Sequence, residues 1–238
     1  MSLNSAATQG LPGIGTNTST VKFINIFKGN PVDQYFLPGG RTVSGTATRD
    51  TGSLGDDGTT VTPGYIRAGT IMGKQTTSGK YANSIIGTLN GAYASGTSMT
   101  VTAATSTELA RRQGSSGTFT LVGPATANGT PTTTTITYSN VASTTIAVTA
   151  PGTAFVSGSF IMPTDGSQYP LVILADNTGL ATVDENGYTQ DVLPQRLAIG
   201  GLINTSNVCF WPTDTGLKSF LKTNFGTSAT NLMFSDSF

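Results

Sequence analysis

Pro170-Leu171-Val172-Ile173-Leu174-Ala175 is the most apolar stretch of this 238-residue chain. A short apolar run bounded by turn residues is typical of a strand in a buried core. The segments that follow support a strand here, because Asp176-Asn177-Thr178-Gly179 and Asp184-Glu185-Asn186-Gly187 have the composition of tight turns. Working outward, we predict further strands at residues 160–163, 197–203 and 208–211. The stretch therefore predicts a mainly β protein.

The rest of the chain outside its middle repeats this alternation of strands and turns. We expect strands at residues 21–27, 65–73 and 80–82, with a polar loop between Pro38 and Pro63. A helix is predicted after Pro212. Its cap is Asp214 or Thr213, its end is Gly226, and its buried stripe comprises Leu217, Phe220 and Leu221.

The middle of the chain differs in style, with longer runs of Thr and Ser. Strands are predicted there at residues 98–102, 118–122, 134–138 and 144–148. Thr105-Ser106-Thr107-Glu108 fits a capping box that opens a short helix closed by Gly114. We therefore expect an extended arm at residues 1–20, a core formed by residues 21–87 and 159–238, and an inserted small β domain at residues 88–158.

Composition excludes several classes of function. The chain has no histidine, and its 12 basic and 12 acidic residues cancel. The missing histidine removes the commonest general base and metal ligand, and the absence of a basic stripe argues against nucleic acid or membrane as a partner. Cys209 has no cysteine to pair with, and we interpret it as a small buried residue of a strand. We expect a soluble, non-enzymatic protein without cofactors that assembles with neighbours.

Three segments resemble the lambda-type head decoration proteins of tailed bacteriophages. They are Pro63-Gly64-Tyr65-Ile66-Arg67-Ala68-Gly69-Thr70-Ile71-Met72-Gly73, Tyr169-Pro170-Leu171-Val172-Ile173-Leu174-Ala175-Asp176 and Val208-Cys209-Phe210-Trp211-Pro212. The resemblance implies a compact, β-tulip or barrel-like core that carries an inserted β domain and a short C-terminal helix. It also implies a protein made in the host cytoplasm that binds the major capsid protein on the outer surface of the virion, as a homodimer or homotrimer.

The expected contacts with partners lie in the two terminal segments. The arm offers Leu3, Leu11, Pro12 and Ile14 for capsid binding, because an extended segment can add a strand to an exposed sheet edge. Phe234 and Phe238 sit in a tail with no obvious core to join, so we expect them to contact a partner subunit. Trp211 is interpreted as a core anchor, with an interface contact as the alternative.

Other groups of residues favour structural roles. Asp184-Glu185 is favoured as part of a hairpin turn, while Gly55-Asp56-Asp57-Gly58 and Asp165-Gly166 lack the spacing of a calcium loop. Gly10-Leu11-Pro12-Gly13-Ile14-Gly15 lacks the Lys and Ser or Thr of a phosphate loop, and Arg111-Arg112 is interpreted as a solvated helix end.

Two alternative functions remain open from the sequence. One is a phage tail, fibre or host-recognition module whose Thr-rich strands bind a glycan or receptor. The other is a glycan hydrolase that brings together two distant acids such as Asp165 and Asp191.

Overall fold

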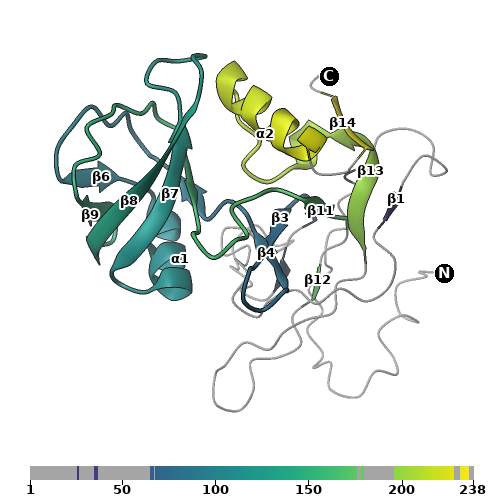
Figure 1. Ribbon diagram of the computed structural model, residues 1–238, viewed down its shortest axis with the longest axis horizontal. Helices are drawn as coiled ribbons and strands as arrows, with labels where there is room; N and C mark the ends of the chain where they lie inside the picture. The colour runs from purple at the N-terminus through teal and green to yellow at the C-terminus, as the bar shows by residue number, and fades with distance from the viewer. Residues whose placement is uncertain are drawn as a thin grey trace, which may run out of the picture.

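The computed structural model describes residues 26, 35–36, 65–66, 68–175, 178–179, 196–227 and 231–235. Over these residues the protein is mainly β, as the sequence predicts. Two six-stranded sheets and one two-stranded sheet hold the strands of the described part. The two larger sheets lie side by side, with helix α2 (Thr215–Thr227) packed between them in Figure 1.

The first sheet has the order β1-β13-β11-β3-β4, and β14 pairs in parallel with β13. We call this sheet, together with α2, the first lobe. The strands of this sheet are β1 (Tyr35–Phe36), β3 (Ile71–Lys74), β4 (Tyr81–Asn83), β11 (Val172–Leu174), β13 (Leu197–Asn204) and β14 (Asn231–Ser235). The short strands β2 (Tyr65–Ile66) and β12 (Thr178–Gly179) pair separately with each other.

Strand β11 lies in the middle of this sheet and comes from the most apolar stretch of the sequence. Ile173 pairs with Ile71 of β3 on one side and with Ala198 of β13 on the other. Successive side chains of a strand point to opposite faces. Ile173 joins the larger core of the lobe, whereas Val172 and Leu174 join a smaller cluster. All three are buried, and burial of each stabilises the fold by roughly 1.5–3 kcal/mol.

The second sheet curls into a small barrel, which we call the barrel lobe. Its strand order is β5-β10-β7-β8-β9-β6. A bridge between Leu89 and Val101 joins its two ends, supported by a 2.9 Å hydrogen bond from Asn90 N to Thr100 O. Its elements are β5 (Gly87–Thr88), β6 (Ser98–Thr100), α1 (Ala103–Gln113), β7 (Gly117–Gly123), β8 (Thr132–Val141), β9 (Thr145–Val148) and β10 (Phe160–Met162).

The barrel encloses a core of its own. It is apolar and mostly aromatic or β-branched, and it includes Tyr93, Met99, Leu109, Phe119, Leu121, Ile136, Tyr138, Ile146, Phe155 and Ile161. Leu109 comes from α1, which lies across one end of the strands in Figure 1. The exposed residues of β8 alternate with Ile136 and Tyr138, so the Thr-rich strands place their hydroxyls outside and their apolar side chains inside.

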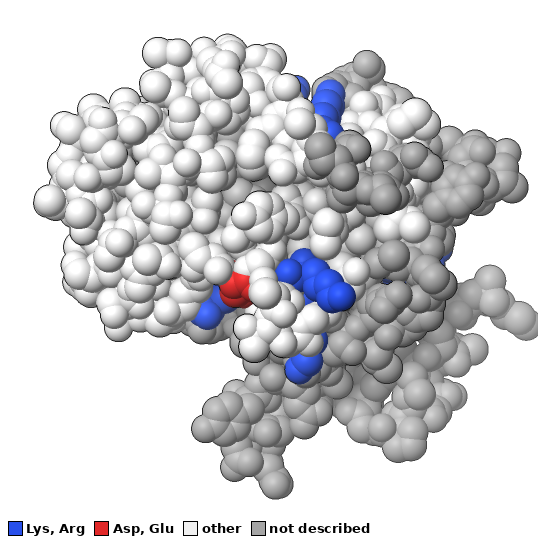
Figure 2. Space-filling view, viewed as in Figure 1, with Lys and Arg blue, Asp and Glu red and all other residues white. Residues whose placement is uncertain are grey.

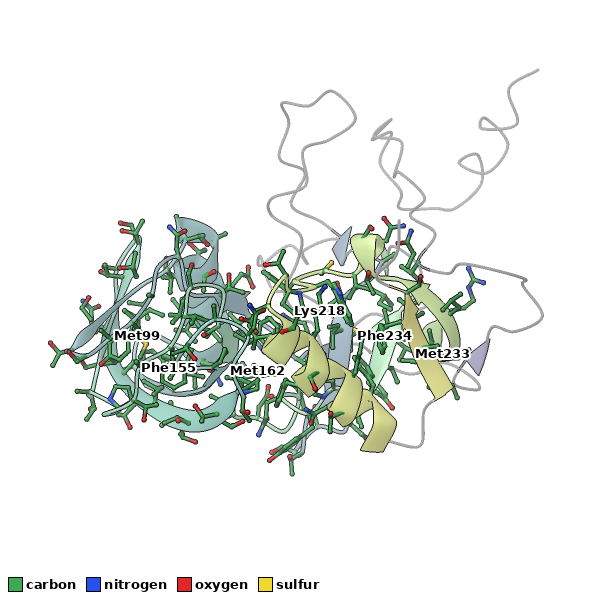
Figure 3. The ribbon with its side chains drawn as sticks, turned by 90° about the horizontal axis from the view of Figure 1, so that it is seen from above. Met99, Phe155, Met162, Lys218, Met233 and Phe234 are labelled. Carbon is green, nitrogen blue, oxygen red and sulfur yellow. The ribbon has the colours of Figure 1, made fainter. Side chains whose placement is uncertain are left out.

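Strand β10 belongs to the walls of both lobes. Ile161 points into the barrel core, whereas Phe160 and Met162 belong to the core of the first lobe. Val122 of β7 also packs into the first lobe, while its neighbour Leu121 packs into the barrel. Met162 accordingly lies between Phe155 of the barrel and Phe234 of the first lobe in Figure 3. The two lobes therefore share a wall and are not connected by a linker alone.

The chain leaves the first sheet after β4 and returns to it at β11. The barrel is built from the intervening residues, and its sheet spans Gly87 to Met162. The division into a core and an inserted domain at residues 88–158 stays a prediction.

Four predicted elements differ from the structure. The predicted strand at residues 65–73 is divided into β2 and β3, with a turn at Ala68 and Gly69, and the predicted tight turn at residues 176–179 is wrong at Thr178–Gly179, which form β12. Helix α1 begins at Ala103, and its N-cap is Thr102, whose hydroxyl accepts a hydrogen bond from Thr105 N at 3.1 Å. The predicted capping box at Thr105 is therefore wrong by one turn, although the helix ends before Gly114 as expected. The predicted strand at 208–211 is also wrong, because a short 3-10 helix, η2 (Thr205–Asn207), leads there into a turn.

Helix α2 follows the prediction more closely. Asp214 caps it by accepting a hydrogen bond from Leu217 N at 3.0 Å. Leu217 and Leu221 are buried and Phe220 packs beside them, as the apolar stripe predicts. The helix continues to Thr227, one residue beyond the predicted stop at Gly226. Of the predicted strand at residues 21–27 only Ile26 is described, and it is buried in the core of the first lobe.

Candidate functional site

A groove of about 280 Å³ lies where the two lobes meet. Thr88, Ser157, Gly158 and Phe160 line it from the barrel lobe. The other wall is the turn before α2 and the first turn of that helix, comprising Phe210, Trp211, Pro212, Thr213, Asp214 and Leu217. We call this feature the interlobe groove.

The turn that forms the second wall is hydrogen-bonded to Gly69, just before β3, and Gly69 is in turn hydrogen-bonded to β11. Cys209 N donates to Gly69 O at 3.0 Å, and Gly69 N donates to Leu174 O at 2.7 Å. Gly69 has a φ of +90°, and a Cβ atom at this position would lie 1.9 Å from Asn207 O. Only glycine allows this close approach of two backbones. Cys209 is half-buried in the turn, and not in a strand as expected.

Phe210 adopts a backbone conformation that is rare for its residue type. The φ angle of Phe210 is +58°, and 43% of the residue's surface is exposed to solvent. A bulky side chain in the left-handed region costs roughly 1–3 kcal/mol and persists only where surrounding contacts enforce it. Here the hydrogen bonds of the neighbouring residues enforce it, from Cys209 N to Gly69 O and from Trp211 N to Val208 O. The result is a partly exposed phenylalanine at the edge of the interlobe groove.

Trp211 and Phe234 are brought together by the fold. Their rings stack with centroids 4.8 Å apart and planes 20° apart, and Phe234 also contacts Phe225 of α2 at 5.3 Å. Phe234 lies on β14, next to β13, as Figure 3 shows. The expectation that the tail has no core to join is therefore wrong for Phe234, because β14 extends the first sheet. Trp211 packs against the same core, as a core anchor does.

Asp214 is the one acidic residue that lines the interlobe groove. Its Oδ1 accepts the hydrogen bond from Leu217 N, and its Oδ2 accepts one from Asn128 N at 2.6 Å. Asn128 returns a contact, since its Oδ1 accepts from Thr215 N at 3.0 Å. The carboxylate thus joins the barrel loop around Asn128 to the start of α2.

A second polar cluster joins the lobes around Arg112. Its guanidinium donates to the backbone O and Oδ1 of Asn83, to Ser167 Oγ and to Asp165 Oδ2. The Arg112 side chain is 1% exposed, so the expectation of a solvated helix end is wrong for this residue. The side chain of Arg111 is not described. The polar partners of Arg112 lie 29 to 55 positions away in sequence, which is why no local pattern indicated this cluster.

Asp165 is held as the ionised partner of this cluster. Burial raises the pKa of its carboxyl group, but the Arg112 guanidinium and hydrogen bonds from Ser167 and Gln75 outweigh burial and hold that pKa below its usual range. A general acid needs a raised pKa. The arrangement therefore gives Asp165 a structural role and argues against its use as the general acid of a hydrolase.

The remaining candidate residues fall in two groups. Leu3, Leu11, Pro12, Ile14, Asp191 and Phe238, with the segments at residues 10–15, 55–58 and 184–187, lie outside the described residues. Within the described ranges, no group of three His, Cys, Asp or Glu side chains is placed to bind a metal ion. No helix of the described part is long and apolar enough to cross a membrane.

The barrel lobe presents an almost uncharged surface. Residues 87–162 contain three charged residues, Glu108, Arg111 and Arg112, and the first and last are buried. Figure 2 shows this lobe as a face nearly free of Lys, Arg, Asp and Glu. Most of its exposed polar side chains are therefore those of Thr and Ser.

Comparison with protein-family models, curated proteins and solved structures found no match.

Sequence reasoning singled out Trp211 and missed its companions in the interlobe groove. Phe210 stands beside Trp211 in the sequence, and this aromatic pair was the available signal. Thr88 and Ser157 join it only through the fold, and no local pattern marks them.

Proposed function

We propose that the protein is a bacteriophage capsid decoration protein that binds the outer surface of the head and stabilises the lattice of the major capsid protein. It acts as a homodimer or homotrimer and catalyses no reaction. Its role is that of a rigid structural protein, and its affinity comes from apolar surface and exposed strand edges.

The observation that supports this proposal most is the meeting of the three segments that resemble the decoration family. The first and second form the adjacent strands β3 and β11, with Met72 opposite Val172. The third is tied to both through Gly69, whose O accepts from Cys209 N and whose N donates to Leu174 O. Segments more than 30 positions apart along the chain thus form one structural unit.

A surface for the partner is available at the edge of the first sheet. Among the described strands, β14 pairs with β13 alone. Met233 of β14 is 62% exposed, although it is a large apolar side chain. An edge strand with an exposed apolar side chain suits the addition of a strand from a capsid subunit or from a second copy. Trp211 and Phe234 lie behind this edge and support it.

The test is to mix the purified protein with expanded, undecorated heads of the phage that encodes it and to image them by cryo-electron microscopy. We expect ordered density at local symmetry axes of the lattice, and its symmetry distinguishes a dimer from a trimer. Bare heads would overturn the proposal and would favour the alternative, a tail, fibre or host-recognition module.

A matched pair of variants tests the proposed contact edge. Met233→Asp places a charge on β14 and is expected to weaken attachment to heads at least tenfold, because the charge is desolvated at the contact. Tyr169→Asp is the control, since Tyr169 is equally exposed at 63% but lies on the loop before β11. Co-sedimentation with heads measures both. Equal binding of the two variants would exclude β14 as the contact edge.

A further inference from the structure

The interlobe groove combines three properties that point to a ligand. The first is that its single charged side chain is already engaged in hydrogen bonds within the protein. Asp214 is its one ionisable lining residue, and both of its carboxylate oxygens accept backbone hydrogen bonds, from Leu217 N and Asn128 N. A cationic ligand would have to compete with the cap of α2 for these oxygens. The groove therefore suits a neutral ligand.

The second property is the pairing of aromatic rings with hydroxyl groups. Phe210 and Trp211 lie on one wall with Thr213, and Thr88 and Ser157 lie on the opposite wall. Exposed aromatic rings bind the apolar faces of a ligand, and hydroxyl groups both donate and accept hydrogen bonds. A sugar ring presents such a combination, because its C–H groups form apolar faces and its hydroxyls lie around the edge.

The third property is the strained backbone of Phe210. A residue of this type at a φ of +58° is destabilising in the free protein, yet the fold keeps Phe210 in this conformation and partly exposed beside the groove. Strain of this kind gathers at binding sites, where it fixes a side chain in position before the ligand arrives.

The dimensions of the groove favour a sugar over a peptide. Its 280 Å³ lies just below the usual range for small-molecule sites, roughly 300–1,000 Å³, and would hold about nine water molecules. Such a space fits one ring and is short for an extended peptide. Strand addition is also blocked at the barrel wall, because β5 pairs with β10 and the residue after it, Leu89, bridges to Val101.

We propose that the interlobe groove binds one uncharged sugar unit, whose apolar face lies against Phe210 and Trp211 and whose hydroxyls contact Thr88, Ser157 and Thr213. The groove adjoins the proposed capsid contact, because Trp211 stacks on Phe234 of β14, but the exposed Met233 of that contact does not line the groove. The sugar is a terminal or internal unit of a neutral glycan.

Trp211 makes the proposal directly testable, because it is the only tryptophan of the chain. Its fluorescence therefore reports on the groove without a label. The full-length protein is titrated with glucose, galactose, mannose, fucose, rhamnose and N-acetylglucosamine. We expect at least one of these sugars to shift the emission saturably. Glucuronate and N-acetylneuraminate, which carry a negative charge beside Asp214, are expected to bind at least tenfold more weakly.

Phe210→Gly is the decisive variant. Glycine adopts a positive φ without strain, so the turn and Trp211 are retained while the ring is lost. We expect the affinity for the sugar to fall about tenfold. Tyr169→Ala removes an exposed aromatic residue elsewhere and is expected to bind as the wild type does. Circular dichroism spectra of the two variants show whether each one is folded.

Three results would overturn the proposal. The first is that none of the six neutral sugars changes the emission of Trp211. The second is that Phe210→Gly binds a sugar as tightly as the wild-type protein. The third is that a proline-rich peptide shifts the emission and displaces every sugar, which would assign the groove to a peptide. Since the titration contains no capsid, it fails or succeeds independently of the decoration proposal.

Discussion

At the scale of single residues, buried polar groups fix how the lobes meet. Arg112 reaches from α1 to Asn83 at the end of β4 and to Asp165 in the segment before β11. The terminal nitrogens of such an arginine need partners, because an unpaired buried polar group costs about 1–3 kcal/mol, and Asn83, Ser167 and Asp165 supply them. The sequence places these residues far apart, and a pair of adjacent arginines at a helix end usually remains in solvent. Only the folded chain distinguishes Arg112 from that common case.

Replacing Arg112 by methionine tests its contribution. Met fills much of the space but removes the guanidinium from Asn83 O and Asp165, which keeps only its hydrogen bonds from Gln75 and Ser167, so we expect the free energy of unfolding to fall by about 2 kcal/mol. The figure is below that for a fully buried pair because the Asp165 side chain is 31% exposed. Urea unfolding measures it, with Lys74→Met on the exposed end of β3 as the control. Equal stability of the two variants would contradict the structural role of Arg112.

The same cluster predicts how stability depends on pH. The pKa of Asp165 is lower in the folded protein than its ordinary value of 3.8, so the folded state binds its proton less readily. Its contribution is therefore present above about pH 4 and is lost as the pH falls through the folded pKa. We expect the stability difference between wild type and Asp165→Asn to shrink between pH 7 and pH 3. A difference that is constant over this range in urea unfolding would contradict this assignment.

At the scale of elements, local patterns succeeded where an element is determined by its own residues. The apolar stretch at β11 and the capped helix α2 were predictable because burial and capping depend on adjacent positions. The turn at residues 208–211 was not, because four apolar residues fit a strand equally well, and its conformation depends on Gly69 more than 130 positions away. The groove escaped prediction for the same reason, since its two walls come from different lobes.

The start of α1 shows how two similar signals compete. Thr102 and Thr105 are both suitable N-cap residues. Glu108, three positions after Thr105, fits the capping-box pattern and favoured Thr105 in the sequence. In the structure Glu108 is buried at 4% exposure, and Thr102 accepts the hydrogen bond from Thr105 N. We expect Thr102→Ala to lower the free energy of unfolding by about 1 kcal/mol, the usual contribution of an N-cap. Thr107→Ala, on the exposed side of the same helix, should leave thermal stability unchanged or slightly raise it.

At the scale of the whole molecule, the shared wall makes the two lobes depend on each other. Phe160 and Met162 contribute to one core and Ile161 to the other, so β10 cannot separate without opening both. We expect a single cooperative unfolding transition, in which the calorimetric and van't Hoff enthalpies agree. Differential scanning calorimetry of the full chain tests this, and two resolved transitions would show that the lobes unfold separately.

A deletion of residues 88–158 follows from the same geometry. It would remove β7 entirely and one of the two residues of β5, leaving β10 without its neighbours in the barrel sheet and Ile161 without a core. The first lobe would also lose Val122 from its own core. The shortened chain is therefore expected to be strongly destabilised, and the barrel is not a removable addition to the fold.

The near absence of charge on the barrel lobe has a consequence for how the protein behaves in a crowded cell. Fixed charges act over a Debye length of about 8 Å at physiological ionic strength, and they attract or repel every polyelectrolyte that comes within that distance. A lobe whose Glu108 and Arg112 are buried exerts almost no such force. Its encounters are governed by shape and hydration, and they stay the same whether the surrounding medium is dilute or rich in salt.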